Sequence, residues 1–336
     1  MAAAGTGRPT RRGVLTGALG AAGAIALAAP QARAAASGGR RLPHILVGDQ
    51  ATRSLLLLDS AKKTWDLAAD PAAALWRYTP DGDPQFADLQ YADGWRYVSE
   101  VKVRRHGRKT YVLATASFGL CFAVEYPTGK RYWGAGLGLG DDLLNPHSIE
   151  LLPNGNIAVA GSTGGLVRIY AASQGPANTT YAEAKLPTAH GVVWDERRDV
   201  LWAIGHDDLV AYRIGGTRAA PTIKQVFSTP LPGPDGHDLF PVAGRPDRMW
   251  VTVNGDIFQY SKRRKAFLQD FPWAAGWPRN KVKAAGVHPD SGTIVTTQPE
   301  PNLGETWWTE RVRLHPEGEP YHLVGGGIYK ARLWQP

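Results

Sequence analysis

The chain has 336 residues, of which 43% are hydrophobic and 20% are charged. A chain of this length and composition can bury a sizeable core, in one large domain or in two smaller ones. Its 39 glycines and 25 prolines argue against a helical bundle or a coiled coil and favour many short strands joined by turns. The 12 tryptophans and 12 tyrosines argue against a disordered chain.

Cysteine content and charge narrow the class of protein further. Cys121 is the only cysteine, which excludes an intramolecular disulfide and a zinc site built from a cysteine cluster. The formal net charge of +8 is modest, and four of the cationic residues fall in a leader segment. The other lysines and arginines are scattered, and short runs such as 262–265 are typical of solvated surface. We therefore expect no nucleic-acid partner.

Residues 1–34 have the pattern of an export signal. The stretch TRRGVL at 10–15 resembles a twin-arginine motif, and an uncharged apolar stretch covers 13–29. Ala32 and Ala34 are the small residues that a signal peptidase reads, and no second span of about 20 apolar residues follows. We expect a twin-arginine-type signal peptide over 1–34, a flexible lead-in over 35–42 and a secreted, extracellular protein. A membrane anchor is the alternative.

The rest of the chain contains a repeat of about 45 residues. Each unit has a short strand, a turn, a β-branched or aromatic strand, a tight link and a third apolar strand. The segments 45–48 and 54–59 match the second and third strands of a sixth unit. The other five units begin at Ser99, His147, His190, His237 and Lys283.

Repeated four-stranded units of this length are typical of the blades of a β-propeller. A unit cannot bury its two apolar faces alone, whereas radial stacking buries both. We predict a single all-β domain over 43–336, a six-bladed β-propeller, with seven blades, a β-sandwich or a solenoid as alternatives. The last strand, 327–334, is expected to close the ring against the first blade. The poorly repetitive segments 64–94 and 299–326 are expected to be insertions on the rim.

A propeller brings residues of different blades to one end of its central channel. The innermost strand of each blade starts at one face of the ring, and the link between the second and third strands returns to that face. The candidates at strand starts are Glu100, His147, His190, His237 and Lys283. The candidates in links are Asp49, Gln50, Ser117, Ser162, Thr163, His206, Asp207, Asn254 and Gln298.

His147, His190 and His237 occupy equivalent positions in three successive blades. Imidazole is the commonest metal ligand, so the three rings could hold one divalent ion with open positions. A twin-arginine leader agrees with a bound metal, because some proteins exported folded carry a cofactor. Two alternatives stay open. The rings could bind a polar or anionic ligand directly. They could also be structural, like the Gly-His pair in propeller repeats of the Trp-Asp type. The dipeptide at 236–237 resembles that pair, although the third strands here lack the Trp-Asp dipeptide.

Further residues are candidates for catalysis or ligand binding. Lys283, His206 and Glu100 could transfer protons at the mouth, with a surface position as the alternative for each. Exposed indoles offer sugars an apolar face with a polar edge, although packing between blades would equally explain them. The candidate ligand-binding residues are Asp49, Gln50, Gln298, Trp273, Trp277, Trp307 and Trp308.

Three segments carry a resemblance to a known family. They are ILVGDQ at 45–50, HSIELLPNG at 147–155 and GIYKARLW at 327–334. Together they resemble an uncharacterised family of secreted bacterial β-propeller proteins, over most of 43–336. The resemblance implies the fold and export, and it implies no activity.

These observations favour an exported enzyme that acts on a carbohydrate or another polar, anionic ligand. In this hypothesis the three histidines hold a metal that polarises a carboxylate, and Lys283 or His206 transfers the proton, as β-elimination from a uronate requires. The alternative is a non-catalytic secreted propeller that binds glycan or protein through its rim. We expect the protein to be a monomer. A third hypothesis is hydrolysis by two carboxylates. The carboxylates available for hydrolysis are Asp49, Glu100, Asp207 and Asp238.

Overall fold

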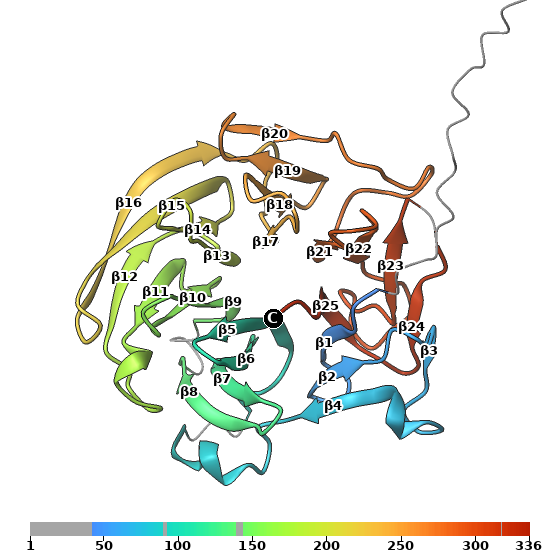
Figure 1. Ribbon diagram of the computed structural model, residues 1–336, viewed down its shortest axis with the longest axis horizontal. Helices are drawn as coiled ribbons and strands as arrows, with labels where there is room; N and C mark the ends of the chain where they lie inside the picture. Colours follow the sequence, from blue (N-terminus) through green and yellow to red (C-terminus); the bar gives the residue numbers. More distant parts are fainter. Residues whose placement is uncertain (1–41, 90–92, 139–143, 317) are drawn as a thin grey trace, which may run out of the picture. The chain divides into compact units, whose positions relative to one another are not determined.

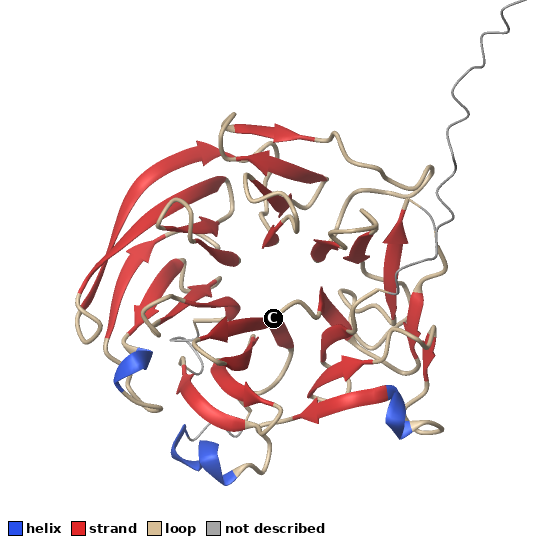
Figure 2. Cartoon of the chain, in the orientation of Figure 1, coloured by secondary structure: helices blue, strands red, loops and turns tan. Residues whose placement is uncertain are grey.

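The computed structural model describes residues 42–89, 93–138, 144–316 and 318–336. Its strands form six sheets around a central axis, which confirms the predicted six-bladed β-propeller (Figure 1). Helix in these residues is limited to short 3-10 turns (Figure 2). The turns are η1 (Pro71–Ala73), η2 (Pro84–Leu89) and η4 (Ala172–Gln174).

The first three blades are antiparallel sheets of four strands, which run in order from the axis outward. Blade 1 consists of β25 (Ile328–Leu333), β1 (Ile45–Asp49), β2 (Ser54–Leu58) and β4 (Ala74–Tyr78). Blade 2 consists of β5 (Val98–His106), β6 (Lys109–Ala116), β7 (Leu120–Tyr126) and β8 (Lys130–Gly136). Blade 3 consists of β9 (Pro146–Leu151), β10 (Ile157–Gly161), β11 (Leu166–Tyr170) and β12 (Tyr181–Lys185).

The other three blades follow the same plan. Blade 4 consists of β13 (Gly191–Asp195), β14 (Val200–Ile204), β15 (Asp208–Gly216) and β16 (Pro221–Pro230). Blade 5 consists of β17 (Asp238–Pro241), β18 (Arg248–Thr252), β19 (Ile257–Ser261) and β20 (Ala266–Leu268). Blade 6 consists of β21 (Ala284–Val287), β22 (Ile294–Thr297), β23 (Arg311–His315) and β24 (Tyr321–Leu323), with β3 (Thr64–Trp65) added in parallel to β24.

The ring closes through blade 1, as the sequence predicts. β25 pairs antiparallel with β1, with Leu333 opposite Ile45 and Ala331 opposite Val47. Blade 1 therefore takes its innermost strand from the end of the chain, and the C-terminus lies near the axis (Figure 1). This pairing covers the free edge of β1, which would otherwise present unpaired backbone groups to the channel.

The prediction that 64–94 and 299–326 are rim insertions was wrong in part. The first segment supplies β3 and β4, and the second supplies β23 and β24. These strands lie between irregular stretches, so the spacing of the repeat is lost. β3 has only two residues, which is too short for an alternating pattern to be visible.

The hydrophobic core lies between neighbouring blades. Leu46 of blade 1 packs in one buried cluster with Val101 and Val112 of blade 2. Ala158 of blade 3 packs in the same way with Leu201 of blade 4. Strands buried on both faces read as continuous apolar runs, as in LLLL at 55–58. Each blade thus buries both faces, as radial stacking requires.

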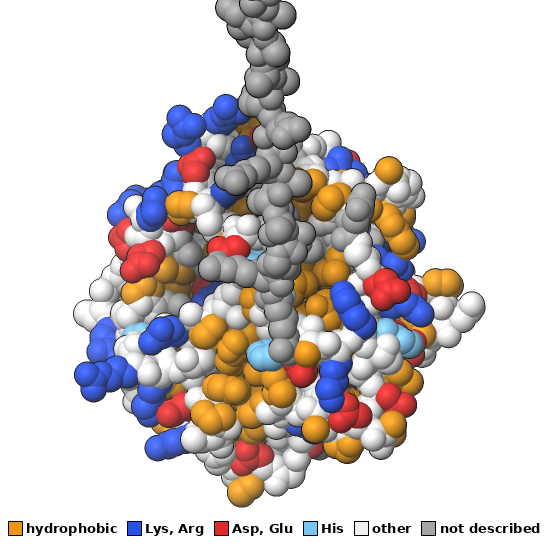
Figure 3. All heavy atoms as spheres, turned by 45° about the vertical axis from the view of Figure 1, so that its right-hand side comes forward, with side chains coloured by type: hydrophobic (Ala, Val, Ile, Leu, Met, Phe, Trp, Pro, Cys, Tyr) orange, Lys and Arg blue, Asp and Glu red, His pale blue; other side chains and the backbone are white. Residues whose placement is uncertain are grey.

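The described ranges contain no helix that is both long and apolar enough to cross a membrane. Charged side chains of both signs are spread over the surface in the space-filling view, with hydrophobic side chains among them (Figure 3). The predicted leader at 1–34 and most of the lead-in at 35–42 lie outside the described residues.

Candidate functional site

Six equivalent residues lie around one mouth of the channel, each within one residue of the start of an innermost strand. In five blades the residue two positions earlier has a left-handed backbone, with φ between 49° and 59°. This conformation is uncommon outside glycine, and here the same turn brings each link back to the axis. The six mouth residues are Ser99, His147, His190, His237, Lys283 and Tyr329. The left-handed residues are Tyr97, Asn145, Thr188, Asp235 and Lys281.

The three histidines of the sequence hypothesis lie together. The ring centroids of His147 and His190 are 4.1 Å apart, and those of His190 and His237 are 5.2 Å apart. Lys283 follows in the next blade, with its Nζ 3.0 Å from Nε2 of His237. The ring of Tyr329 lies between the two ends of this series, 6.1 Å from the His147 ring and 5.9 Å from Nζ of Lys283. The mouth is therefore a continuous arc of polar side chains.

Hydrogen bonds fix which ring nitrogens carry protons. Nδ1 of His147 lies 3.0 Å from the carbonyl oxygen of Asn145, which can only accept, so this nitrogen is protonated and Nε2 is free to accept. The ammonium of Lys283 donates to Nε2 of His237, which places the proton of that neutral ring on Nδ1. Nδ1 of His190 and Nδ1 of His237 are buried and have no hydrogen-bond partner among the described residues.

Burial and neighbouring cations keep the histidines neutral. Burial lowers the pKa of His147 to about 4 and that of His237 to about 3, and the charges of Lys283 and Lys330 add to both shifts. Burial and the two flanking imidazoles hold the pKa of His190 well below its usual range. Burial, followed by the charge of Lys330, lowers the pKa of Lys283 to about 8. Near neutral pH the mouth therefore carries three neutral imidazoles and a largely protonated lysine.

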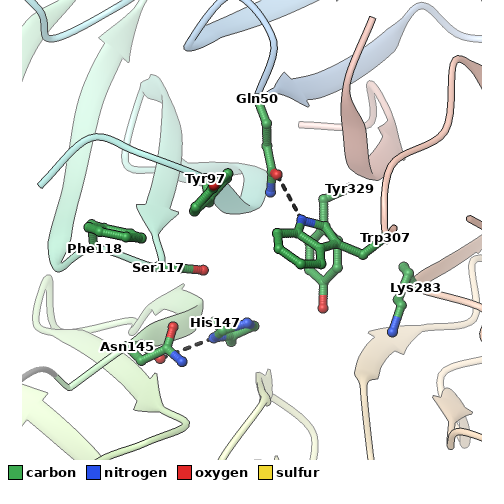
Figure 4. Close-up of a pocket in the computed structure, with 9 residues that line it drawn as sticks. All are labelled: Gln50, Tyr97, Ser117, Phe118, Asn145, His147, Lys283, Trp307 and Tyr329. Atoms are coloured by element: carbon green, nitrogen blue, oxygen red, sulfur yellow. Dashed lines mark hydrogen bonds between the residues drawn. The ribbon is translucent and has the colours of Figure 1, made fainter. Parts of the chain in front are cut away.

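A pocket of about 380 Å³ opens over this arc (Figure 4). Trp307, Tyr97 and Phe118 supply aromatic surface, and Lys283, Tyr329 and Ser117 supply hydrogen-bond donors. Figure 4 shows these side chains around a common space, with His147 and Asn145 on the side of blade 3. The complete lining is Gln50, Tyr97, Ser117, Phe118, Asn145, His147, Lys283, Trp307 and Tyr329. Aromatic walls with a few convergent polar groups are typical of sites for small polar ligands.

The aromatic wall is held by hydrogen bonds between distant segments. Oε1 of Gln50 accepts from the indole nitrogen of Trp307 at 3.0 Å, and Nε2 of Gln50 donates to the carbonyl of Val98 at 2.8 Å. The hydroxyl of Tyr97 donates to Glu305 at 2.5 Å. These contacts fix the segment before β23 against blades 1 and 2, so the wall is formed before any ligand arrives.

Below the mouth, buried ion pairs fill the channel. Arg332 of β25 binds Glu100 at 2.9 Å and Asp238 at 2.6 Å, and Lys330 lies 3.3 Å from both carboxylates. Burial opposes ionisation of Glu100 and Asp238, but the nearby cations, Arg332 foremost, outweigh it and hold both pKa values below their usual range. The channel is therefore closed below the pocket by charged side chains that join blades 1, 2 and 5.

The charges along the channel do not balance. The network continues through Glu150, which Arg104 binds at 2.5 Å and Lys102 approaches at 3.5 Å. Four cationic side chains thus face three carboxylates in the described part of the channel. Lys283 adds a further cation above them. In the described ranges no carboxylate lies within ion-pair distance of it, and the more distant charge of Asp235 offsets only part of the lowering of its pKa. The mouth therefore favours an anionic ligand.

Two observations disfavour a metal held by all three histidines. Within the described residues, no group of three or more His, Cys, Asp or Glu side chains is placed to hold a metal ion. The lone pair on Nε2 of His237 faces the ammonium of Lys283, and that cation with Lys330 would repel a divalent ion.

Several predicted site residues lie away from the pocket. Asp49 is buried and accepts from the backbone N–H of Gly327 at 2.7 Å, so it holds the turn after β1 against β25. Nε2 of Gln298 donates to the carbonyls of Pro278 and Asn280, while its Oε1 is buried without a partner among the described residues. These two side chains therefore hold backbone segments in place.

The two further candidates for acid–base chemistry are also displaced. Glu100 lies one residue past the mouth position, at 1% exposure, in the ion-pair network below the pocket. His206 lies in the link after β14, where its Nδ1 is 2.8 Å from Asp235 and Nε2 is 3.7 Å from Asp207. Neither residue is among those that line the pocket.

The four candidate tryptophans occupy different environments. Trp307 lines the pocket, and Trp308 donates to the same amide oxygen of Gln50 from behind the wall. Trp273 stacks on His315 with ring centroids 3.8 Å apart. Trp277 is 46% exposed and has the guanidinium of Arg313 over its ring at 4.3 Å. Only Trp307 of the four therefore contributes to the mouth.

Four pocket residues, Tyr97, Phe118, Asn145 and Tyr329, were not predicted from the sequence. Tyr329 follows Lys283 at the spacing of the repeat, so an alignment of the last strand as a sixth innermost strand would have found it. Nothing in the sequence marks Tyr97, Phe118 and Asn145, because they lie outside the strands, before β5, after β6 and before β9.

The protein is therefore a six-bladed propeller with a polar, cationic pocket at one mouth of its central channel, and buried ion pairs close the channel below that pocket. The family model described as "Family of unknown function (DUF6528)" matches residues 60–335, so the chain belongs to this family. A comparison with curated proteins finds no match.

Two solved structures are similar to the chain. A protein of unknown function from Bacteroides caccae has 13% identity and a TM-score of 0.55, over 86% of this chain and 98% of that one. Sqt1 from Saccharomyces cerevisiae has 12% identity and a TM-score of 0.43, over 61% of this chain and 57% of that one. The chain thus spans little more than half of Sqt1. At such identity the likeness to the Bacteroides protein shows the fold alone.

Proposed function

We propose that the mouth pocket binds a sugar that carries a carboxylate. The observation that carries this proposal is the cation at Lys283, which faces the pocket without a carboxylate partner in the described ranges. A ligand carboxylate would accept from Lys283 and from the hydroxyl of Tyr329. A sugar hydroxyl would donate to the free Nε2 of His147, and the apolar face of the ring would stack on Trp307.

Titration calorimetry with a galacturonate disaccharide tests this proposal, with the neutral galactose disaccharide as comparison. Wild-type protein should bind the acidic sugar more tightly, and the affinity should fall as the pH rises through about 8, where Lys283 loses its charge. Lys283→Met should weaken binding by about tenfold or more. Lys281→Met, which removes an exposed lysine two positions away, should change the affinity little. Equal affinity for the two sugars would overturn the proposal.

A second candidate, β-elimination, is favoured by the lowered pKa of Lys283. A pKa of about 8 leaves a fraction of neutral amine near pH 7, which can act as a base. Lys283 would take the proton from C5 of a uronate, and that electron pair would form the C4=C5 double bond as the C4–O bond breaks. The leaving oxygen would take its proton from Tyr329, and solvent would restore both side chains.

Lys283→Arg separates binding from elimination. Arginine keeps the charge but cannot serve as a base near neutral pH, so the variant should retain the acidic sugar and form no unsaturated product. Ultraviolet absorbance of the unsaturated uronide measures the reaction. Absence of product from wild-type protein on uronate oligosaccharides would leave binding as the function of the pocket.

Two hypotheses from the sequence stay predictions: that the three histidines hold a metal, and that tryptophans on the rim bind a glycan or a protein. Each has its own test. Elemental analysis of protein prepared without a polyhistidine tag would show one divalent ion per chain if the three histidines hold a metal, and His190→Ala should release it. Trp277 is the most exposed of the candidate tryptophans, which favours it as the rim contact for a glycan or protein. A glycan array comparing wild type with Trp277→Ala tests the rim.

We further propose that the protein acts outside the cytoplasm, after twin-arginine export directed by residues 1–34. The support is the pattern TRRGVL, the apolar stretch and the small residues before position 35. N-terminal sequencing of the exported protein should find a chain that begins near residue 35. Replacing both arginines at 11 and 12 with lysine should retain the precursor inside the cell.

A further inference from the structure

The face opposite the mouth carries a hollow of about 650 Å³ lined by arginines. Its walls are the tips of three hairpins, which join β13 to β14, β17 to β18 and β19 to β20. β13 starts beside His190 at the mouth and ends at Asp195, so these tips lie at the far end of the strand. We call this site the arginine hollow. Its arginines are Arg197, Arg198, Arg245, Arg248, Arg263 and Arg264.

Two of the six arginines are fixed by ion pairs, one of which joins two of the hairpins. Arg198 binds Asp247 of the next blade at 2.7 Å and Asp195 of its own blade at 3.3 Å. Arg248 binds the two oxygens of Asp270 at 2.5 and 2.8 Å. The hairpin tips are therefore held against one another, and the hollow does not depend on a ligand for its shape.

The other four arginines are exposed and have no ion-pair partner in the part of the chain that the structure describes. Arg197 and Arg245 come from different blades, and Arg263 and Arg264 lie in the turn between β19 and β20. Lys265 adds a further cation to that turn, and Glu196 adds one exposed carboxylate beside Arg197. Such crowding of like charges is unfavourable, and a bound polyanion would relieve it.

We propose that the arginine hollow binds a linear acidic polysaccharide through its sulfate or carboxylate groups. The planar guanidinium pairs with two oxygens of such a group at once. The hollow is large enough for more than one anionic group, and its cations come from three hairpins, which suits a chain better than a single ion. Pro246 is the one apolar residue in the lining, which disfavours insertion into a bilayer. The lining offers no aromatic ring on which a base could stack.

A heparin-derived oligosaccharide is the probe for this site, with affinity measured at several salt concentrations. Wild-type protein should bind it, and the triple variant R197S/R263S/R264S should lose about tenfold or more in affinity and show a shallower salt dependence. The matched control R77S/R105S/R108S removes three exposed arginines elsewhere and should stay within about twofold of wild type.

Three results would overturn the arginine hollow as a polysaccharide site. One is the absence of heparin binding to wild-type protein at low salt. Another is an equal loss in the two triple variants, which would mean that net charge alone drives binding. The third is equal or tighter binding to phosphatidylserine vesicles or to duplex DNA at the same salt concentration.

Discussion

At the scale of single residues, Arg332 is the side chain on which the closed channel depends most. It is 1% exposed and binds carboxylates from blades 2 and 5 while it belongs to blade 1. A buried ion pair gains little over a well-packed apolar replacement, but removing one partner leaves the others charged and without compensation. The network is therefore a set of mutually dependent charges.

Arg332→Leu should lower the free energy of unfolding by about 3–5 kcal/mol, because Glu100 and Asp238 would each lose their main partner. Urea unfolding followed by tryptophan fluorescence measures the change. Lys109→Gln is the control, since it breaks an exposed pair with Glu125 at 2.6 Å and should leave the midpoint nearly unchanged. Similar midpoints for the two variants would contradict the role of the network.

The histidines make stability depend on pH in a defined window. His147 has a pKa of about 4 and His237 of about 3 in the folded protein, against 6.5 when unfolded. Below about pH 6.5 these histidines are protonated in the unfolded chain but stay neutral in the folded protein. The free energy of unfolding therefore falls as the pH drops toward 4, by up to about 1.4 kcal/mol per pH unit for each histidine. Urea unfolding across this window should show a shallower slope for His237→Gln than for wild type. An unchanged slope would contradict the burial of a neutral ring.

At the scale of elements, the links that lead to the innermost strands decide where the mouth residues lie. Gly236 precedes His237, and a Cβ at this position would collide with the carbonyl oxygen of Gly205 and the side chain of Ile204. The link from blade 4 to blade 5 can therefore approach the end of β14 only because residue 236 lacks a side chain.

Gly236→Ala should cost about 1–3 kcal/mol of stability, because the link must move away from blade 4. The same movement should weaken binding of the acidic sugar, since His237 and its partner Lys283 would shift. Thermal unfolding and calorimetry measure the two effects. Gly255→Ala, in the link between β18 and β19, is the control, because a Cβ there meets no atom within 4 Å. Equal thermal stability and equal sugar affinity of the two variants would contradict this role of the link between blades 4 and 5.

At the scale of the whole molecule, the sequence predicted the ring well and the pocket in part. The spacing from His147 to Lys283 predicts successive innermost strands because each blade repeats the same topology. Because His147, His190 and His237 occupy equivalent positions in successive blades, the repeat also predicts that their imidazoles lie close together. The pocket wall was not predictable, since Trp307 and Tyr97 are placed by Gln50 and Glu305, contacts across long irregular segments that leave no periodic signal. The buried ion pairs below the pocket were also not predictable, because Glu100 and Arg332 come together only when β25, at the end of the chain, pairs with β1.

The most direct test of an anion-binding mouth is a crystal structure of the protein with a galacturonate disaccharide. We expect the ligand carboxylate within hydrogen-bond distance of Nζ of Lys283 and the sugar ring against Trp307. The ion pairs of Arg332 below the pocket should stay intact. A sugar bound elsewhere with the mouth empty at saturating ligand, or a metal ion seated between the three imidazoles, would contradict this function of the mouth.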